Sequence, residues 1–181
     1  MLSNTKRLNL SKRMSFSLRH GPQFFDFTMN DQAQVELNDF ARAVGIPLET
    51  VLWIVENDEK NRFTVRNGLI WCSQGHTFNS GIEFPVVSDA DMPAYLYHGT
   101  KMSFLNSIIE TGLRSMSRQY VHLSGDTVRA QTVADRRKGK SIILRIDTAL
   151  LRDAGIVVRI AENGVYLTED IPADCISLLL D

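Results

Sequence analysis

The chain has 181 residues, of which 44% are hydrophobic and 23% charged, a composition typical of a folded globular protein with a buried core. Its 20 Lys and Arg residues and 21 Asp and Glu residues leave a formal net charge of −1, which excludes a basic coat for nucleic acid and confines any phosphate site to a local cluster. The two cysteines, Cys72 and Cys175, lack CxxC spacing, so neither a zinc motif nor a disulfide scaffold is indicated.

Apolar residues recur at helical spacing in three segments of the first half, and each pattern predicts a helix. Gly21-Pro22 is expected to end the first helix and Gly45 the second, whereas Pro47 suits the first turn of the third. Asn67-Gly68 then separates the β-rich runs FTVR and LIW, a strong signal for a hairpin with a type I′ turn. Three helices and a hairpin favour a winged-helix-like module. The predicted inward positions are Leu10, Met14 and Leu18, then Leu37, Phe40, Ala41 and Val44, then Leu48, Val51, Leu52 and Val55.

Short strands dominate the second half, beyond a break at residues 85–93 where two prolines and acidic residues interrupt the hydrophobic pattern. AYLYHG predicts a strand that turns at Gly99, residues 104–111 a short helix closed by Gly112, and residues 127–137 a helix with a basic end. Further strands are predicted at YVHLS, SIILRI, GIVVRI, VYLT and CISLLL. This pattern favours a compact mixed or antiparallel sheet, and hence an α+β chain of two lobes, 1–88 and 89–181.

Arg19-His20, at the expected end of the first helix, is the first candidate for chemistry. Arginine offers five donors in a planar fork that suits phosphate, and histidine exchanges a proton near neutral pH. The structural alternative is that cations in the last helical turn are stabilised by the helix dipole. Taken alone, Arg62 is more typical of a surface ion pair, whereas Arg118 lies in a polar loop ahead of an apolar strand. For His76, in QGHT, a polar turn and a functional role are equal alternatives.

His98 and His122 each stand in a strand-like segment, YHGT and YVHLS, where a partly buried structural histidine is common. Both are followed by small or hydroxyl-bearing residues, Gly99-Thr100 and Ser124. That pairing suits the close approach of a ribose or diphosphate to the backbone, but it identifies no particular cofactor.

Taken together and in order, the motifs LSKRMSFSLRH, NRF, QGHT, LYHGT, MSRQYVHLS and NGVYLT resemble those of the RNA 2′-phosphotransferase (KptA) family. The resemblance runs from about Leu10 to Ile176. It implies a winged-helix-like N-terminal lobe that holds RNA and a C-terminal lobe with the ADP-ribosyltransferase fold that binds NAD. The implied activity removes an internal 2′-phosphate from a tRNA-like RNA and consumes NAD.

The reaction that the resemblance implies has two steps. The 2′-phosphate attacks C1″ of the nicotinamide ribose and expels nicotinamide, which leaves an ADP-ribosylated phosphate. The ribose O2″ then attacks that phosphate, which releases 2′-hydroxyl RNA and ADP-ribose 1″,2″-cyclic phosphate. The family's catalytic Arg-His-Arg-Arg set carries over onto Arg19, His20, Arg62 and Arg118. Arginines suit a transition state that spreads charge over phosphate oxygens, while His20 is either a general acid-base or a phosphate ligand.

The resemblance also implies cofactor contacts in the second half of the chain. A strand histidine commonly contacts the adenosine ribose in ADP-ribosyltransferase folds, which suits His98, and His122 and Ser124 are then expected nearer the nicotinamide. No metal is indicated, since arginines supply the charge that Mg²⁺ supplies in other phosphoryl-transfer sites. The full set of implied NAD contacts is His98, Gly99, Thr100, His122, Ser124 and Asn163.

Two other readings of the function stay open. The same site would serve an ADP-ribosyltransferase that acts on another acceptor, such as a terminal nucleic-acid phosphate. A catalytically silent winged-helix module would bind nucleic acid without turning over NAD. No apolar run approaches the roughly 18 residues of a membrane span, and no signal-peptide core is present, so we expect a cytoplasmic protein without membrane contact. Nothing in the sequence demands more than a monomer.

Overall fold

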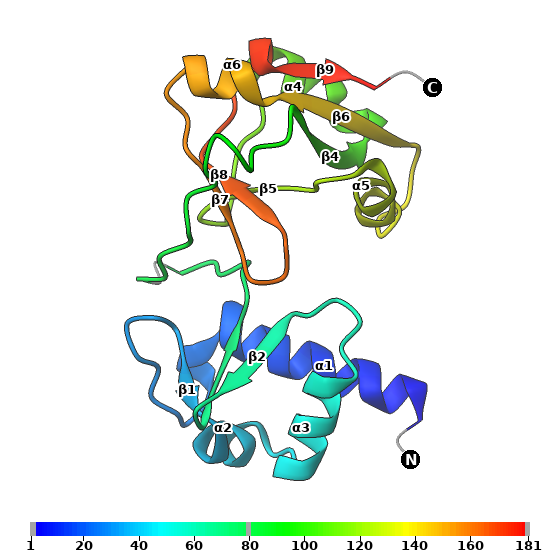
Figure 1. Cartoon of the computed structure of the whole chain (residues 1–181). Helices are drawn as coiled ribbons and strands as arrows, with labels where there is room; N and C mark the ends of the chain where they lie inside the picture. Colours follow the sequence, from blue (N-terminus) through cyan, green and yellow to red (C-terminus); the bar gives the residue numbers. More distant parts are fainter. Residues whose placement is uncertain (1–2, 79–80, 180–181) are drawn as a thin grey trace. The chain divides into compact units, whose positions relative to one another are not determined.

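The computed structural model describes residues 3–78 and 81–179, and within them six α-helices and three small antiparallel sheets form (Figure 1). The α+β class predicted from the sequence is confirmed. The contacts between residues divide the chain into two compact units, Met1–Glu83 and Phe84–Asp181, and each unit has a buried apolar core of its own. The assignment of these parts as winged-helix-like and ADP-ribosyltransferase-like lobes stays a prediction.

The three predicted helices of Met1–Glu83 are present. They are α1 (Asn4–Arg19), α2 (Leu37–Val44) and α3 (Leu48–Glu56). Ser3 caps α1 by accepting a hydrogen bond from the Lys6 N–H at 3.3 Å, which satisfies one of the free donors of the first turn. Gly45 ends α2 in the left-handed region, at φ +62, where glycine meets no steric cost.

A three-stranded antiparallel sheet lies against these helices. It consists of β1 (Val35–Glu36), β2 (Phe63–Arg66) and β3 (Leu69–Cys72) in the order β1-β3-β2. Asn67 and Gly68 both have positive φ, at +51 and +75, as a type I′ turn requires, so the predicted hairpin is confirmed. The edge strand β1 was not predicted, because two residues are too few to show an alternating pattern.

The inward face of α3 differs from the prediction. Val51 is fully buried and Ile54 is 2% exposed, whereas Leu48 and Leu52 are 37% and 41% exposed. Since each helical residue advances by about 100°, Leu52 lies a quarter-turn from Val51, at the edge of the stripe that the small sheet and α2 cover. The predicted inward faces of the first two helices are confirmed. Met14, Leu18, Phe40 and Val44 have no exposed surface.

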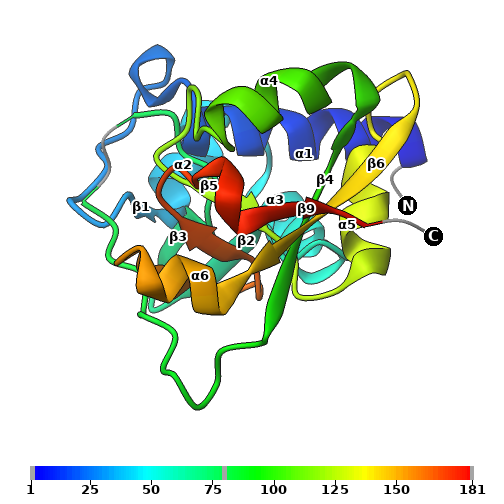
Figure 2. The same cartoon turned by 90° about the horizontal axis from the view of Figure 1, so that it is seen from above.

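Phe84–Asp181 contains two three-stranded antiparallel sheets. One has the order β4-β6-β9, from β4 (Tyr95–Lys101), β6 (Ser141–Asp147) and β9 (Ile176–Leu178), which lie side by side in Figure 2. The other has the order β5-β8-β7, from β5 (Val121–Leu123), β7 (Val158–Ile160) and β8 (Tyr166–Thr168). Tyr97 and Ser124 exchange backbone hydrogen bonds of 2.9 and 2.8 Å and so link the two sheets.

The helices of this second unit are α4 (Leu105–Thr111), α5 (Thr127–Ala134) and α6 (Thr148–Asp153). Gly112 closes α4 at φ +77, as predicted. The predicted helix over residues 127–137 ends at Ala134 instead, so its basic residues follow the helix rather than forming its last turn. α6 was not predicted, since only six residues form it.

Gly99 does not turn its strand, contrary to the prediction. β4 continues through it to Lys101 in unbroken register with β6. A Cβ at Gly99 would overlap the carbonyl of Ala130, because α5 packs directly on this face of the strand. Close helix packing therefore requires glycine here.

No helix within residues 3–78 and 81–179 has both the length and the apolar character needed to cross a membrane.

Candidate functional site

The end of α1 lies against the loop that follows the β2–β3 hairpin. The Thr77 N–H donates to the carbonyl of Arg19 at 2.9 Å, and the Thr77 hydroxyl lies 3.3 Å from Nδ1 of His20. Gly75 turns this loop at φ +93, and a Cβ there would lie 3.6 Å from Nε of Arg19. The loop thereby holds both members of the Arg19-His20 pair.

The guanidinium of Arg19 has two buried donors without an acceptor. Nη1 donates to the Ser15 hydroxyl at 3.3 Å, but Nε and Nη2 have no hydrogen-bond partner within the described part of the chain. A buried N–H left without an acceptor costs about 1–3 kcal/mol, and more on a charged group. An oxyanion is the class of ligand that satisfies two adjacent guanidinium donors at once.

His76 and Cys72 lie near the guanidinium of Arg19, and both side chains are neutral at pH 7. His76 is 2% exposed, and burial, followed by the charges of Arg19 and His20, lowers its pKa from 6.5 to about 4. Both ring nitrogens of His76 lack a partner among the described residues. Burial raises the pKa of the Cys72 thiol to about 11, although the charge of Arg19, a hydrogen bond from its side chain and the charge of Arg62 oppose that shift.

Arg62 is held by a buried ion pair with Asp58. Its Nη2 and Nε lie 2.6 and 3.0 Å from Asp58 Oδ1, and its backbone N–H donates to Oδ2 at 2.6 Å. Nη2 also donates to the Ser11 hydroxyl of α1 at 2.8 Å. Burial raises the pKa of Asp58, but the hydrogen bonds and charge of Arg62 outweigh it and hold that pKa below its ordinary value. The ion pair anticipated for Arg62 is present, but the side chains are only 24% and 3% exposed, so it is not a surface pair.

Arg118 lies in the loop between α4 and β5. Asp170 anchors this loop by accepting the Ser115 N–H at 2.8 Å and pairing with Arg114 at 3.1 Å. The hydrogen bond from Ser115, with the charge of Arg114, holds the pKa of Asp170 below its ordinary value. The side chain of Arg118 is exposed, and its charge acts on His98.

His98 and His122 lie close together at the junction of β4 and β5. Nδ1 of His98 lies 3.0 Å from the carbonyl of His122, and Nδ1 of His122 lies 2.9 Å from the carbonyl of Tyr120. A carbonyl only accepts, so each Nδ1 carries the proton. Burial, with a smaller effect from Arg118, lowers the pKa of His98 and keeps its ring neutral, while the His122 carbonyl opposes that shift. The other nitrogen of His98, Nε2, is therefore an acceptor.

The remaining predicted cofactor residues flank these histidines. Ser124 is 8% exposed and pairs with the strand of His98 through Tyr97, while Thr100 is half-buried two residues further along that strand. Asn163 lies in the β7–β8 turn, and the pairing of Leu123 with Tyr166 puts that turn at the Ser124 end of the sheet.

The backbone around Asn163 is held by α5, but its side chain is not satisfied. Arg129, in the first turn of α5, donates to the Asn163 carbonyl at 3.0 Å. Oδ1 of Asn163 and Nη1 of Arg159 are buried without a partner in the described ranges. A ligand that both donates and accepts hydrogen bonds would complete them.

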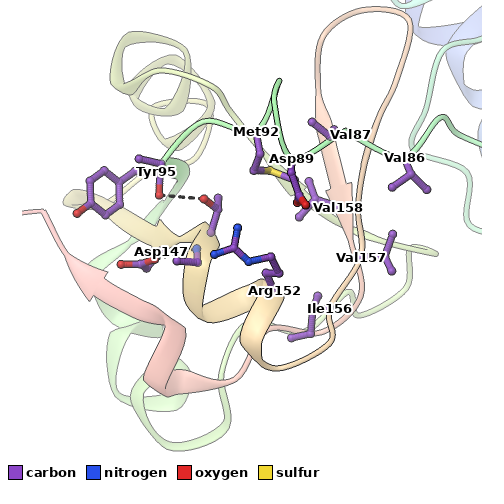
Figure 3. A pocket seen from close by; sticks show the side chains of 13 residues that line it. Val86, Val87, Asp89, Met92, Tyr95, Asp147, Arg152, Ile156, Val157 and Val158 are labelled. Atoms are coloured by element: carbon purple, nitrogen blue, oxygen red, sulfur yellow. Dashed lines mark hydrogen bonds between the residues drawn. The ribbon is translucent and has the colours of Figure 1, made fainter.

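The second unit also has a pocket of about 460 Å³ apart from these residues (Figure 3). It lies between the segment before β4, α6 and β7, and its lining includes Met92, Asp147, Arg152 and Val158. None of the predicted catalytic or cofactor residues lines it. Among residues 3–78 and 81–179, no group of three or more His, Cys, Asp or Glu side chains is placed to hold a metal ion.

Comparison with known proteins identifies the family. The family model described as "RNA 2′-phosphotransferase, Tpt1 / KptA family" matches residues 5–170. The chain belongs to the RNA 2′-phosphotransferase family. It is accordingly a transferase, and the substrate class of the family is RNA that carries a 2′-phosphate.

Relatives from distant organisms match the chain over nearly its full length. A probable RNA 2′-phosphotransferase of Rhizobium leguminosarum bv. trifolii is 36% identical over 172 residues, which is 93% of this chain and 92% of the relative. A second, from Thermococcus kodakarensis, is 34% identical over 178 residues, 96% of this chain and 97% of the relative. A third, from Streptomyces coelicolor, is 35% identical over 177 residues, 95% of each chain.

Within this RNA 2′-phosphotransferase, the first unit brings Arg19, His20 and Arg62 together, and the second brings His98, His122 and Arg118 together. Asp58 was not predicted from the sequence, where its only local signal is its position four residues before Arg62, in an acidic run at the end of α3. For His76, the sequence left a polar turn and a functional role as equal alternatives. Arg159 carried no signal, because an arginine in a short strand is ordinarily exposed.

Proposed function

We propose that this chain removes an internal 2′-phosphate from RNA, consumes NAD, and releases 2′-hydroxyl RNA, nicotinamide and ADP-ribose 1″,2″-cyclic phosphate. Met1–Glu83 binds the phosphorylated RNA, and Phe84–Asp181 binds NAD. NAD supplies the electrophilic C1″ that the 2′-phosphate attacks, and its ribose O2″ then takes the phosphate from the RNA.

One observation carries the proposal. Arg19 presents two buried, unpartnered N–H donors next to His20. Phosphate oxygens accept from such a fork in a bidentate way, which fixes the orientation of the phosphate as well as its charge. His76 is neutral nearby and the Cys72 thiol stays protonated, so Cys72 places no thiolate beside Arg19 to compete with the substrate.

Arg62 contributes a second guanidinium whose position is set before the substrate arrives. Its contacts with Asp58 and Ser11 hold it by Nε and Nη2. Donors that are already oriented toward the place where charge develops lower a barrier without reorganisation during the reaction. Arg62 thus stabilises the second step, in which the ribose hydroxyl attacks the phosphate. The third arginine of the proposed catalytic set, Arg118, belongs to Phe84–Asp181.

The second unit offers groups that fit a ribose and an amide. Nε2 of His98 accepts a ribose hydroxyl, because Nδ1 donates to the His122 carbonyl. The buried Oδ1 of Asn163 accepts a donor from the ligand. Ser124 and Thr100 supply hydroxyls beside the same strands, and α5 fills the other face of Gly99.

The test is to incubate the protein with NAD and a short RNA that bears one labelled internal 2′-phosphate, with Arg19→Ala as the comparison. We expect the label to move to ADP-ribose 1″,2″-cyclic phosphate only when NAD is present, and Arg19→Ala to lower that rate at least about 100-fold. A matched RNA with only a terminal phosphate forms the second arm. Transfer of ADP-ribose to that terminal phosphate, without transfer of the internal label, would overturn the proposal in favour of another acceptor.

A further inference from the structure

We propose that Phe16 and Phe24 form a platform on which a nucleobase of the RNA stacks, next to His20. This inference rests on the proposed function, since it concerns how that substrate is held. The ligand is a base of single-stranded RNA adjoining the phosphate that Arg19 binds.

The two rings lie parallel and open to solvent. Phe16 is on the exposed side of α1 and Phe24 ends η1 (Pro22–Phe24), and their side chains are 45% and 71% exposed. Their centroids are 6.4 Å apart, with 9° between the planes. The ring of His20 is 6.3 Å from that of Phe16. The platform is thus contiguous with a predicted catalytic residue.

The backbone between the rings is built to bring them together. Gly21 donates to the Phe16 carbonyl at 3.0 Å, and Phe24 donates to the Gly21 carbonyl at 3.1 Å, so the chain reverses between the two aromatic residues. A Cβ at Gly21 would lie 2.7 Å from Cε1 of Phe16 and 2.8 Å from Cδ2 of Phe24. Glycine therefore lets both rings close over this turn.

The charge around the platform favours RNA over a protein partner. Residues 1–25 contain five Lys and Arg residues and no Asp or Glu, in a chain whose net charge is −1. Lys12 and Arg13 are exposed on α1, and the unpartnered donors of Arg19 follow at its end. Aromatic rings among backbone-binding cations are the usual construction of a single-strand site, because every base presents a π face.

Stacking predicts which kinetic constant the rings control. A base stacked away from the reacting phosphate is bound equally in the ground state and the transition state. Loss of a ring therefore raises KM for RNA and leaves kcat nearly unchanged. If a ring only packed within the protein, the effect of its loss on KM or kcat would not depend on whether the RNA carries a base at that position.

The experiment compares Phe24→Leu, Phe24→Trp and Phe104→Leu. Phe104 is 46% exposed in η2 (Met102–Phe104) and belongs to Phe84–Asp181 rather than to the unit proposed to bind RNA, so Phe104→Leu is the matched control. Binding is measured by fluorescence anisotropy with 2′-phosphorylated RNA, and with the same RNA made abasic at the nucleotide on either side of the phosphate.

We expect Phe24→Leu to weaken binding of the intact RNA roughly tenfold, within the range of base stacking on aromatics. One abasic RNA should abolish that difference between Phe24→Leu and the unaltered protein, which identifies the stacked base. Phe24→Trp should retain or improve affinity, and Phe104→Leu should have no effect. Equal affinities of Phe24→Leu and the unaltered protein for intact RNA would overturn the platform, as would an equal loss for intact and abasic RNA.

The failure of this inference is distinguishable from failure of the proposed function. If the protein transfers the phosphate and Phe24→Leu leaves KM for RNA unchanged, the platform is wrong and the function stands. If no phosphate is transferred but Phe24→Leu weakens binding to intact RNA alone, the platform stands and the proposed function is wrong. A protein that binds no RNA at all overturns the platform.

Discussion

Arg19 and Arg62 are neighbours of the same buried thiol, yet their surroundings differ in a way that assigns them different tasks. Arg62 is paired with Asp58 and bonded to Ser11, so its position is set by the protein. Arg19 has donors that nothing in the described chain satisfies. A paired guanidinium is a fixed charge, whereas an unpaired one is a binding site for an anion that comes from outside.

Replacing Asp58 tests the fixed charge. Asp58→Asn removes the anion and leaves Arg62 buried without a counter-charge, which should lower the unfolding free energy by about 3 kcal/mol. The variant should also accumulate ADP-ribosylated RNA, because a misplaced Arg62 stabilises the second step less well. Tryptophan fluorescence during urea unfolding measures the stability, since Trp53 and Trp71 both lie in the first unit.

The exposed pair of Asp39 and Arg42, whose side chains are 47% and 70% exposed, supplies the control. Asp39→Asn should cost less than about 1 kcal/mol and leave product formation unchanged. A similar loss of stability for both variants, with no intermediate accumulating in Asp58→Asn, would argue against a positioning role for Asp58.

His76 predicts a pH dependence of stability. Its pKa is lowered to about 4 in the folded state, against 6.5 ordinarily, so the unfolded chain binds more protons between these two values. The stability that a neutral His76 preserves is thus present above pH 6.5 and is lost as the pH falls from 6.5 toward 4. Between pH 7 and pH 5 this residue should contribute a loss of about 2 kcal/mol. His76→Gln should flatten that part of the profile, and an unchanged slope would contradict the assignment.

At the scale of single elements, the close packing of a helix on a strand explains the glycine in β4 better than secondary-structure propensity does. β4 and α5 meet at Gly99, where the carbonyl of Ala130 occupies the space that a side chain would need. The same helix binds the β7–β8 turn through Arg129. α5 thus connects the strand of His98 with the turn of Asn163, and its seating controls both.

Gly99→Ala should displace α5 and lower the unfolding free energy by about 3 kcal/mol or more, because a backbone carbonyl has nowhere to shift. Hydrogen exchange of the α5 amides is the direct measurement and should show faster exchange. Gly125→Ala is the control, since a Cβ there meets only the edge of the Tyr166 ring, at 3.2 Å. If α5 stays as protected in Gly99→Ala as in Gly125→Ala, the packing argument fails.

At the scale of the whole molecule, the predicted catalytic and cofactor residues are distributed over both units of the chain. Arg19, His20 and Arg62 belong to Met1–Glu83, whereas Arg118 and the predicted NAD contacts belong to Phe84–Asp181. Charge is also distributed unevenly along the chain. Residues 1–25 contain no acidic residue, although the whole chain has a net charge of −1. Neither unit alone contains the complete set, so the proposed reaction needs the intact chain.

The sequence determined features that depend on neighbours along the chain. The periodic apolar residues predicted α1, α2 and α3, and Asn67-Gly68 predicted its turn, because helix and turn preferences are local. Six weak motifs in order identified the family, which the match over residues 5–170 confirms. The catalytic and cofactor residues taken from that resemblance stay predictions.

Only the tertiary structure decided which surfaces are covered and which polar groups are paired. Leu52 is exposed because the sheet beside α3 is narrow, and Gly99 is required by a helix some thirty residues further along the chain. The burial of His76 and the unpartnered donors of Arg19 likewise depend on segments brought together by folding. The burial of a side chain and the hydrogen-bond pairing of a polar group depend on neighbours that are distant in sequence. The local sequence pattern therefore does not predict them.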